Sequence, residues 1–259
     1  MLNQVLLYPN KNFYYLCYEE SSSAILTAFL NAYCNIPLHN LDTREAIKEY
    51  LRTGETDHFQ VINKETTQAF IQKKEEFFKL VSSGRLNIQH INYKEDDLCN
   101  AIRYLNQYGN TGAVVIDYIQ LINMQPKEKK LFGTRQEEVK EICQRLNTTA
   151  KETRLPILVA AQFNRETKKI TDMHETGLRE AADLEQIANT IIGVWDNNKN
   201  EVDKFTEKEL KWIAKQIGCE VDEIKQKSLF VKILKSRYLQ AGETATWNYT
   251  WLTNKIHNN

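Results

Sequence analysis

The sequence predicts an α/β fold with a mostly parallel twisted sheet and helices on both faces of that sheet. The first supporting observation is the run Ala113-Val114-Val115-Ile116, which follows a turn at 109–112 and contains three β-branched residues. A short continuous apolar run of this kind is typical of a strand buried on both faces of a parallel sheet. The second is that segments of strand and helix character alternate along the chain, as in wound parallel sheets.

Further strands are predicted where short runs of apolar, β-branched and aromatic residues occur. These runs are 13–18, 86–91, 155–161, 187–195, 229–234 and 246–252. Helices are predicted by apolar stripes at helical spacing and by capping signals. They cover 1–8 (the end of a helix), 24–33, 43–51, about 63–83, 98–105, about 135–150 and a segment after Thr206.

The whole chain, 1–259, is predicted to form one domain, in which 196–227 is an inserted helical excursion of polar composition. Within this insertion, Thr206 and Glu209 have the spacing of a capping box, and Gly218 is a helix stop signal.

Composition limits the classes of function. Lysine plus arginine equals aspartate plus glutamate at 34 each, so any nucleic-acid binding depends on local patches. The five cysteines are widely spaced and include no C-x-x-C pair, which favours reduced thiols in a cytoplasmic protein over a zinc site or a disulfide framework. No apolar run approaches the roughly 18 residues of a membrane span, so no membrane association is expected.

Acidic residues follow two of the predicted strands. Asp117 ends the run at 113–116, and Glu19 and Glu20 follow the strand at 13–18. In open α/β folds ligands bind outside the carboxyl ends of the strands, where a carboxylate can hold Mg²⁺ through water. Simpler interpretations remain open: Asp117 caps the next turn, and the two glutamates favour the positive end of the following helix.

Five segments in order resemble the C-terminal ATPase domain of the DnaB replicative helicases, which has a RecA-like three-layer fold. They are VVIDYIQLI, RQEEVKEICQRLNTTAKE, LPILVAAQFNRE, LREAADLEQIANTII and VKILKSRYLQAGE. The resemblance covers nearly the whole chain except the insertion. It implies ATP and Mg²⁺ as cofactors, and ATP-driven 5′ to 3′ movement on single-stranded DNA by a hexameric ring that meets primase and a helicase loader.

The resemblance also implies a role for individual residues. Asp117 matches the Walker B aspartate that supports magnesium, and Glu19 matches the catalytic glutamate that orients the attacking water. Gln162 matches the polar sensor between the γ-phosphate and the DNA loop. Lys235 and Arg237 match the pair that reaches into the nucleotide site of a neighbouring subunit.

The resemblance further covers a segment around 179–189. Its matching residues are Arg179, Glu180, Glu185 and Gln186, while Ala182, Ile187 and Asn189 depart from the family pattern. These departures concern the local loop geometry and leave the predicted fold unchanged.

Two polar loops match those that line the central channel of such rings. The first polar loop, 125–133, carries three lysines, and the second polar loop, 164–177, carries three more basic residues. The expected DNA-binding residues are Lys127, Lys129, Lys130, Arg165, Lys168 and Lys169. A solvated charge run is the alternative interpretation of the lysines in the first loop.

The chain contains no G-x-x-x-x-G-K-[ST], the loop that wraps phosphates in backbone N–H groups. In the family this loop and the first strand precede the segment with which the sequence starts. Truncation is the favoured explanation, and natural loss or supply by another polypeptide are the others. The alternative to a helicase motor is therefore a nucleotide-binding-deficient RecA-like remnant that binds DNA or assists assembly. A RadA-type recombinase is disfavoured by the DYIQL and K-S-R patterns.

Overall fold

A computed structural model gives the structure of most of the chain. It describes residues 1–34, 49, 52–55, 64–164, 173, 184–196, 205–217, 220–222, 229–238, 244–250 and 255–257. Most of the predicted helix at 43–51 lies outside these residues, and so do Asn63, Gly218 and most of the second polar loop.

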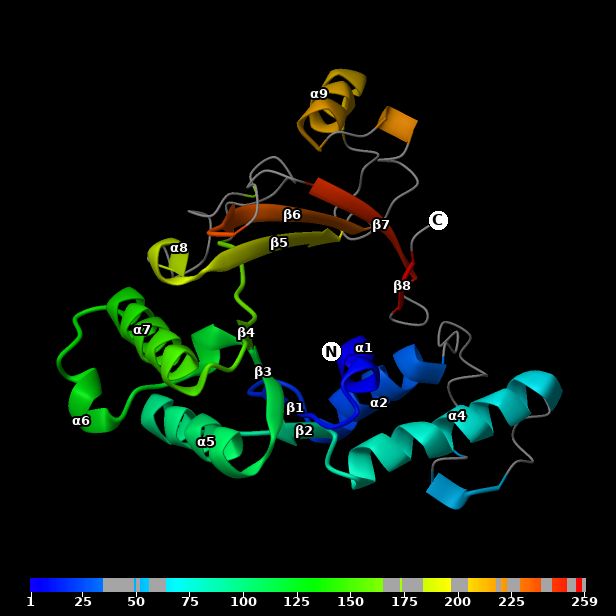
Figure 1. The fold of residues 1–259 in the computed structure, drawn as a ribbon. Helices are drawn as coiled ribbons and strands as arrows, with labels where there is room; N and C mark the ends of the chain where they lie inside the picture. Colours follow the sequence, from blue (N-terminus) through cyan, green and yellow to red (C-terminus); the bar gives the residue numbers. More distant parts are fainter. Residues whose placement is uncertain are drawn as a thin grey trace.

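The first part of the chain forms a four-stranded parallel sheet with the strand order β2-β1-β3-β4 (Figure 1). Its strands are β1 (Asn12–Cys17), β2 (Leu86–His90), β3 (Thr111–Asp117) and β4 (Ile157–Val159). All three pairings are parallel, with Cys17 opposite Asp117 and Ile116 opposite Val159. The carboxyl ends of the four strands therefore share one edge, called here the carboxyl edge.

Helices cover both faces of this sheet, as predicted (Figure 1). One face packs on α5 (Glu95–Tyr108) and α7 (Arg135–Thr153), and the other packs on α1 (Leu2–Leu7), α2 (Ser22–Cys34) and α4 (Lys64–Ser82). Residues alternate between the faces because successive strand side chains point in opposite directions. Leu16 and Ile116 join the α5–α7 core, whereas Phe13 joins the core with α2 and α4.

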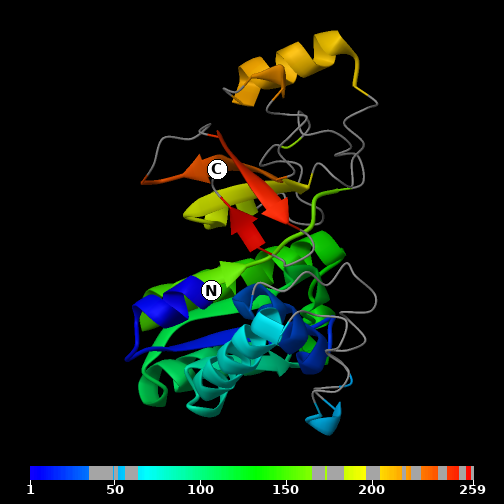
Figure 2. The same ribbon diagram turned by 90° about the vertical axis from the view of Figure 1, so that its right-hand side faces the viewer.

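The later strands form a second, antiparallel sheet in the order β5-β6-β7-β8. Figure 2 shows this sheet beside the parallel one, with α9 on its outer side. The elements are α8 (Leu184–Ile187), β5 (Thr190–Asp196), α9 (Glu207–Ile217), β6 (Leu229–Ser236), β7 (Thr244–Thr250) and β8 (Lys255–His257).

The α/β class is confirmed, but the later strands differ from a mostly parallel sheet. The connections at 239–243 and 251–254 are too short for a parallel crossover, which needs about a dozen residues. β7 and β8 must therefore run antiparallel to their predecessors.

One local expectation needs correction. The sequence predicts a buried strand at 155–161, yet β4 has three residues and Leu158 is 54% exposed. Among the described strands β4 pairs only with β3, which leaves it at the side of its sheet. Within the predicted insertion 196–227, Leu210 and Ile213 of α9 share a hydrophobic cluster with Trp195.

The predicted capping box at the start of α9 is present: the Thr206 backbone N–H donates to Glu209 (2.9 Å) and the Glu209 backbone N–H donates to Thr206 Oγ1 (3.3 Å). Four cysteines in the described part of the chain, Cys17, Cys34, Cys99 and Cys143, are buried and form no disulfide there. None of the described helices combines the length and the apolar character that a membrane crossing requires. The extent of the single domain stays a prediction.

Candidate functional site

Asp117 is the last residue of β3 and lies half-buried at the carboxyl edge. Its Oδ2 accepts a hydrogen bond of 2.6 Å from the hydroxyl of Tyr15 on the neighbouring strand β1. Burial, and secondly the Asp117 carboxylate, raise the pKa of Tyr15, so this hydroxyl stays protonated and donates. One carboxylate oxygen is thereby fixed, while Oδ1 remains as an acceptor on the same rigid group.

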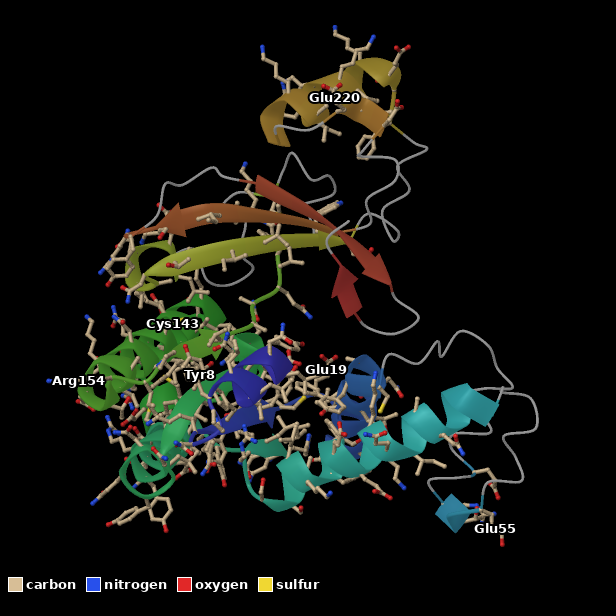
Figure 3. The ribbon with its side chains drawn as sticks, turned by 45° about the vertical axis from the view of Figure 1, so that its right-hand side comes forward. Tyr8, Glu19, Glu55, Cys143, Arg154 and Glu220 are labelled. Carbon is tan, nitrogen blue, oxygen red and sulfur yellow. The ribbon has the colours of Figure 1, made fainter. Side chains whose placement is uncertain are left out.

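Glu19 lies where the chain passes from β1 to α2, and its side chain is exposed (Figure 3). The backbone around it is held on both sides. The Tyr18 N–H donates to the Asp117 carbonyl (2.8 Å), and the Glu20 carbonyl lies 2.9 Å from His90 Nδ1. This turn therefore presents Glu19 next to the end of β3.

The competing interpretation of Glu19 and Glu20 as helix-terminus charges has little support. The first turn of α2 begins at Ser22 and contains no acidic residue. Ser21 supplies the start of the helix instead, since its Oγ accepts from the Ala24 N–H (3.2 Å). Helix-dipole effects fall off within the first turn, so both glutamates gain little from them.

Gln162 follows the end of β4 by three residues and is exposed. The backbone before it is tied to β3, because the Ala160 N–H donates to the Ile116 carbonyl (2.9 Å) and the Ile119 N–H donates to the Ala160 carbonyl (3.0 Å). The side chain of Gln120 contacts both backbone polar groups of Gln162. Neither Gln120 nor Tyr15 was singled out from the sequence.

Three predicted residues thus follow three adjacent strands. The strands β1, β3 and β4 are neighbours in that order. Glu19 follows β1, Asp117 is the last residue of β3, and Gln162 follows β4. The parallel topology places all three at the carboxyl edge. Two carboxylates and an amide at one edge are groups that can hold a metal ion through water, orient a water molecule and contact a phosphate.

Lys235 and Arg237 belong to the antiparallel half instead. Lys235 lies in β6 and donates to the Glu185 carbonyl, while Arg237 follows β6 and donates to the Gln186 carbonyl (3.1 Å). Both cations therefore bind the backbone of the short helix α8. Arg237 remains exposed, and neither residue has a described contact with Asp117.

The first polar loop contains a short helix, α6 (Pro126–Lys129). Lys127 and Lys130 are exposed, whereas Phe132 is partly buried against the core and is poorly placed to stack on a base. Of Lys129 only the backbone is described. In the second polar loop, Arg165, Lys168 and Lys169 lie outside the described residues, as do Arg179 and Glu180.

A cluster of charges that the sequence did not reveal surrounds Arg145. Its guanidinium forms ion pairs of 2.7–3.1 Å with four carboxylates from α5, α6 and α7: Glu95, Asp96, Glu128 and Glu141. Burial and the neighbouring carboxylates raise the pKa of Glu95, which Arg145 opposes. Three of the carboxylates are close enough to share a metal ion, but the guanidinium already supplies a cation there.

The parallel sheet with helices on both faces and polar groups at its carboxyl edge fits a RecA-like fold, and solved structures of similar fold agree. The chain is similar to a solved ATPase domain, with a TM-score of 0.68 and 17% identity over 97% of this chain and 75% of that one. It is also similar to a DnaB-like replicative helicase solved for its interactions with primase, with a TM-score of 0.66 and 16% identity over 96% of this chain and 50% of that one.

Sequence relatives point to the same family. The replicative DNA helicase DnaB of Mycoplasma genitalium is 33% identical over 132 residues, which are 50% of this chain and 26% of that protein. DnaB of Mycobacterium leprae is 39% identical over 92 residues, 35% of this chain and 15% of that protein. The matches thus span about a quarter or less of these relatives.

The family model for the DnaB-like helicase C-terminal domain matches residues 3–242. The chain therefore belongs to the DnaB-like helicase C-terminal domain family.

Proposed function

We propose that this chain is the motor domain of an ATP-driven replicative DNA helicase that moves 5′ to 3′ along single-stranded DNA as a hexameric ring. The observation that carries the proposal is the position of Glu19, Asp117 and Gln162 behind three adjacent parallel strands in a member of the DnaB-like family. Phosphoryl transfer depends mainly on positioning and on charge stabilisation, and both follow from a rigid sheet edge.

Each residue has a distinct role in this proposal. Asp117 holds Mg²⁺ through water with the carboxylate oxygen that Tyr15 leaves available. Glu19 orients the water that attacks the γ-phosphate, and its exposure suits contact with a ligand. Gln162 contacts the γ-phosphate with its amide. Bound Mg²⁺ supplies charge neutralisation on the phosphates of ATP.

The cations of the antiparallel half act in trans in this proposal. Lys235 and Arg237 reach the nucleotide site of the neighbouring subunit, where an arginine is typically worth about 10³–10⁵ in rate. Their bonds to the α8 backbone hold them at the end of β6, and the exposure of Arg237 supports an outward role. Their described contacts are with α8 and not with Asp117, which favours action on a second subunit over action on their own.

The two polar loops bind the DNA strand. Exposed Lys127 and Lys130 support this role for the first loop, together with Lys129, and the proposal extends to Arg165, Lys168 and Lys169 of the second. One of the similar solved helicases was determined for its interactions with primase, so primase is a proposed partner here, as is a helicase loader. A cytoplasmic location is part of the same proposal.

A second candidate is a DNA-binding or assembly module that does not hydrolyse ATP. The observation that favours it is the absence of any G-x-x-x-x-G-K-[ST] in the sequence, because that loop provides the backbone N–H groups and the lysine that hold the phosphates.

ATP hydrolysis in the presence of poly-dT separates the two candidates. We expect no measurable turnover from this chain alone and poly-dT-stimulated turnover when the chain is joined to the phosphate-loop segment of a DnaB relative. Binding of poly-dT without turnover by the joined protein would favour the assembly module. Turnover by this chain alone would contradict the requirement for the loop.

A further inference from the structure

The side chain of Gln120, in a short 3-10 helix that follows β3, contacts the backbone of Gln162. Its Nε2 donates to the Gln162 carbonyl and its Oε1 accepts from the Gln162 N–H, each at 3.4 Å. The two bonds satisfy both backbone groups of one residue from one amide. Both are near the upper limit of hydrogen-bond length, so each is weak.

The backbone of Gln120 is held much more firmly than this bridge. The guanidinium of Arg135, in the first turn of α7, donates to the Gln120 carbonyl (2.9 Å) and to the Ile122 carbonyl (2.6 Å). The same guanidinium pairs with Glu138 (2.6 Å), which is 2% exposed and accepts from the Met124 N–H (3.0 Å). Charge-assisted bonds of this length are about twice as strong as neutral ones.

These contacts connect the first polar loop to Gln162. The loop ends at Gly133, and a capping box between Thr134 and Glu137 fixes the start of α7 directly after it. The first polar loop, Arg135, the 120–124 segment and Gln162 therefore form one continuous series of contacts. Within this series the bridge from Gln120 to Gln162 has the longest hydrogen bonds, at 3.4 Å each.

We propose that Gln120 is a positioning residue that couples occupancy of the first polar loop by single-stranded DNA to the placement of the Gln162 backbone. The inference rests on the proposed function for the identity of the ligand, but the bridge itself stands on the hydrogen bonds alone. Gln120 touches neither DNA nor nucleotide in this account. It acts through Gln162.

Hydrogen exchange at the Gln162 amide tests the proposal in this chain as it stands. In the absence of DNA, Gln120→Ala should speed exchange at this amide by about twofold, the factor that corresponds to a net hydrogen bond of about 0.5 kcal/mol, the lower end for hydrogen bonds. Gln144→Ala is the matched control, because Gln144 is an exposed glutamine on α7. In this variant the Gln162 amide should exchange at the wild-type rate. Gln120→Glu keeps the acceptor but loses the donor, so an intermediate rate is expected.

Addition of poly-dT then tests the coupling. On addition of poly-dT, the exchange rate of the Gln162 amide should change by a similar factor in the wild type and in Gln144→Ala. In Gln120→Ala this rate should stay the same with and without poly-dT. Fluorescence anisotropy should show equal poly-dT affinity for all three proteins. Equal basal exchange in the wild type, Gln120→Ala and Gln120→Glu would overturn the positioning role. A Gln120→Ala response equal to the wild type would overturn the coupling.

Failure of the proposed function has a different signature. If the wild type does not bind poly-dT by anisotropy, the DNA-binding role and the coupling both fail. The basal exchange of Gln120→Ala against Gln144→Ala still decides whether Gln120 positions Gln162.

Discussion

The two sheets of this molecule use their faces in different ways. The central strand β3 of the parallel sheet contributes Val114 and Ile116 with no exposed surface, and helices cover both sides. Strand β5 of the antiparallel sheet alternates instead, with Ile191 buried while Ile192 and Val194 are 57% and 53% exposed.

This difference explains where each half carries polar groups. A sheet covered on both faces leaves only its strand ends for ligands, so Glu19, Asp117 and Gln162 lie at one edge. A sheet with one open face can carry cations within a strand, as β6 does with Lys235. We therefore expect the parallel half to respond strongly to core substitutions and the antiparallel half to respond weakly to substitutions on its exposed face.

The largest expected effect on stability is in the doubly covered sheet. Ile116→Ala should lower the free energy of unfolding by about 2–5 kcal/mol, because a fully buried side chain is lost and a cavity remains. Val194→Ala on the exposed face of β5 should change it by less than about 0.5 kcal/mol. Urea denaturation measures both, and similar losses in the two variants would contradict the contrast.

The next largest effect is expected for Arg145→Ala, which should lower the free energy of unfolding by about 2 kcal/mol. The substitution leaves Glu95, with no exposed surface, without its cation, although the 28% exposure of Arg145 keeps the loss below the roughly 3–5 kcal/mol of a fully buried pair. Arg103→Ala breaks an exposed pair with Glu152 and should cost less than about 1 kcal/mol. Thermal unfolding compares the two variants, and a larger loss in Arg103→Ala would refute the assignment.

Tyr15→Phe should lower the free energy of unfolding by about 1 kcal/mol at neutral pH, because the Asp117 carboxylate loses a hydrogen-bond donor. The loss should shrink at high pH. The folded-state pKa of Tyr15 is raised, so its contribution is complete below the unfolded pKa of 10.0 and declines as the pH rises above it.

Urea midpoints of the wild type and Tyr15→Phe between about pH 8 and 11 measure this effect of alkaline pH. The wild type should lose more stability than the variant above the unfolded-state pKa of 10.0. A constant difference between the two proteins across this range would show that Tyr15 ionises equally in both states.

The smallest effect is expected for Arg237→Ala. Arg237 is exposed and its guanidinium donates to one described acceptor, the Gln186 carbonyl, so the free energy of unfolding should change by less than about 0.5 kcal/mol in calorimetry. A loss above about 1 kcal/mol would assign Arg237 to anchoring α8 and weaken its proposed role in a neighbouring subunit. Lys127→Ala, at another exposed cation, is the matched control.

Much of the fold was predictable because strand ends and helix caps are local signals. The run at 113–116 and the aromatic run at 13–18 identified β3 and β1, and parallel pairing then placed Asp117 and Glu19 at one edge. The capping box of α9 was predicted in the same way. The family resemblance is confirmed, whereas the site roles it implies remain predictions.

The missed features depend on contacts between distant parts of the chain. Tyr15 and Asp117 are 102 residues apart, and Gln120 and Gln162 are 42 apart, so no local pattern marks either pair. Arg145 binds Glu95 and Asp96 from α5 and Glu128 from α6 for the same reason, whereas its pair with Glu141 is a local i, i+4 contact. The exposure of Leu158 was missed because a short apolar run does not indicate whether its strand has one partner or two.

The central claim is that Glu19 serves a nucleotide site at the carboxyl edge. Its most direct test is poly-dT-stimulated ATP hydrolysis by the chain joined to a phosphate-loop segment, comparing Glu19→Gln with Glu20→Gln, the adjacent exposed glutamate. Glu19→Gln should lower turnover by about 10²–10⁴-fold, while Glu20→Gln should retain most of it. Equal turnover in the two variants, or a larger loss in Glu20→Gln, would contradict the account.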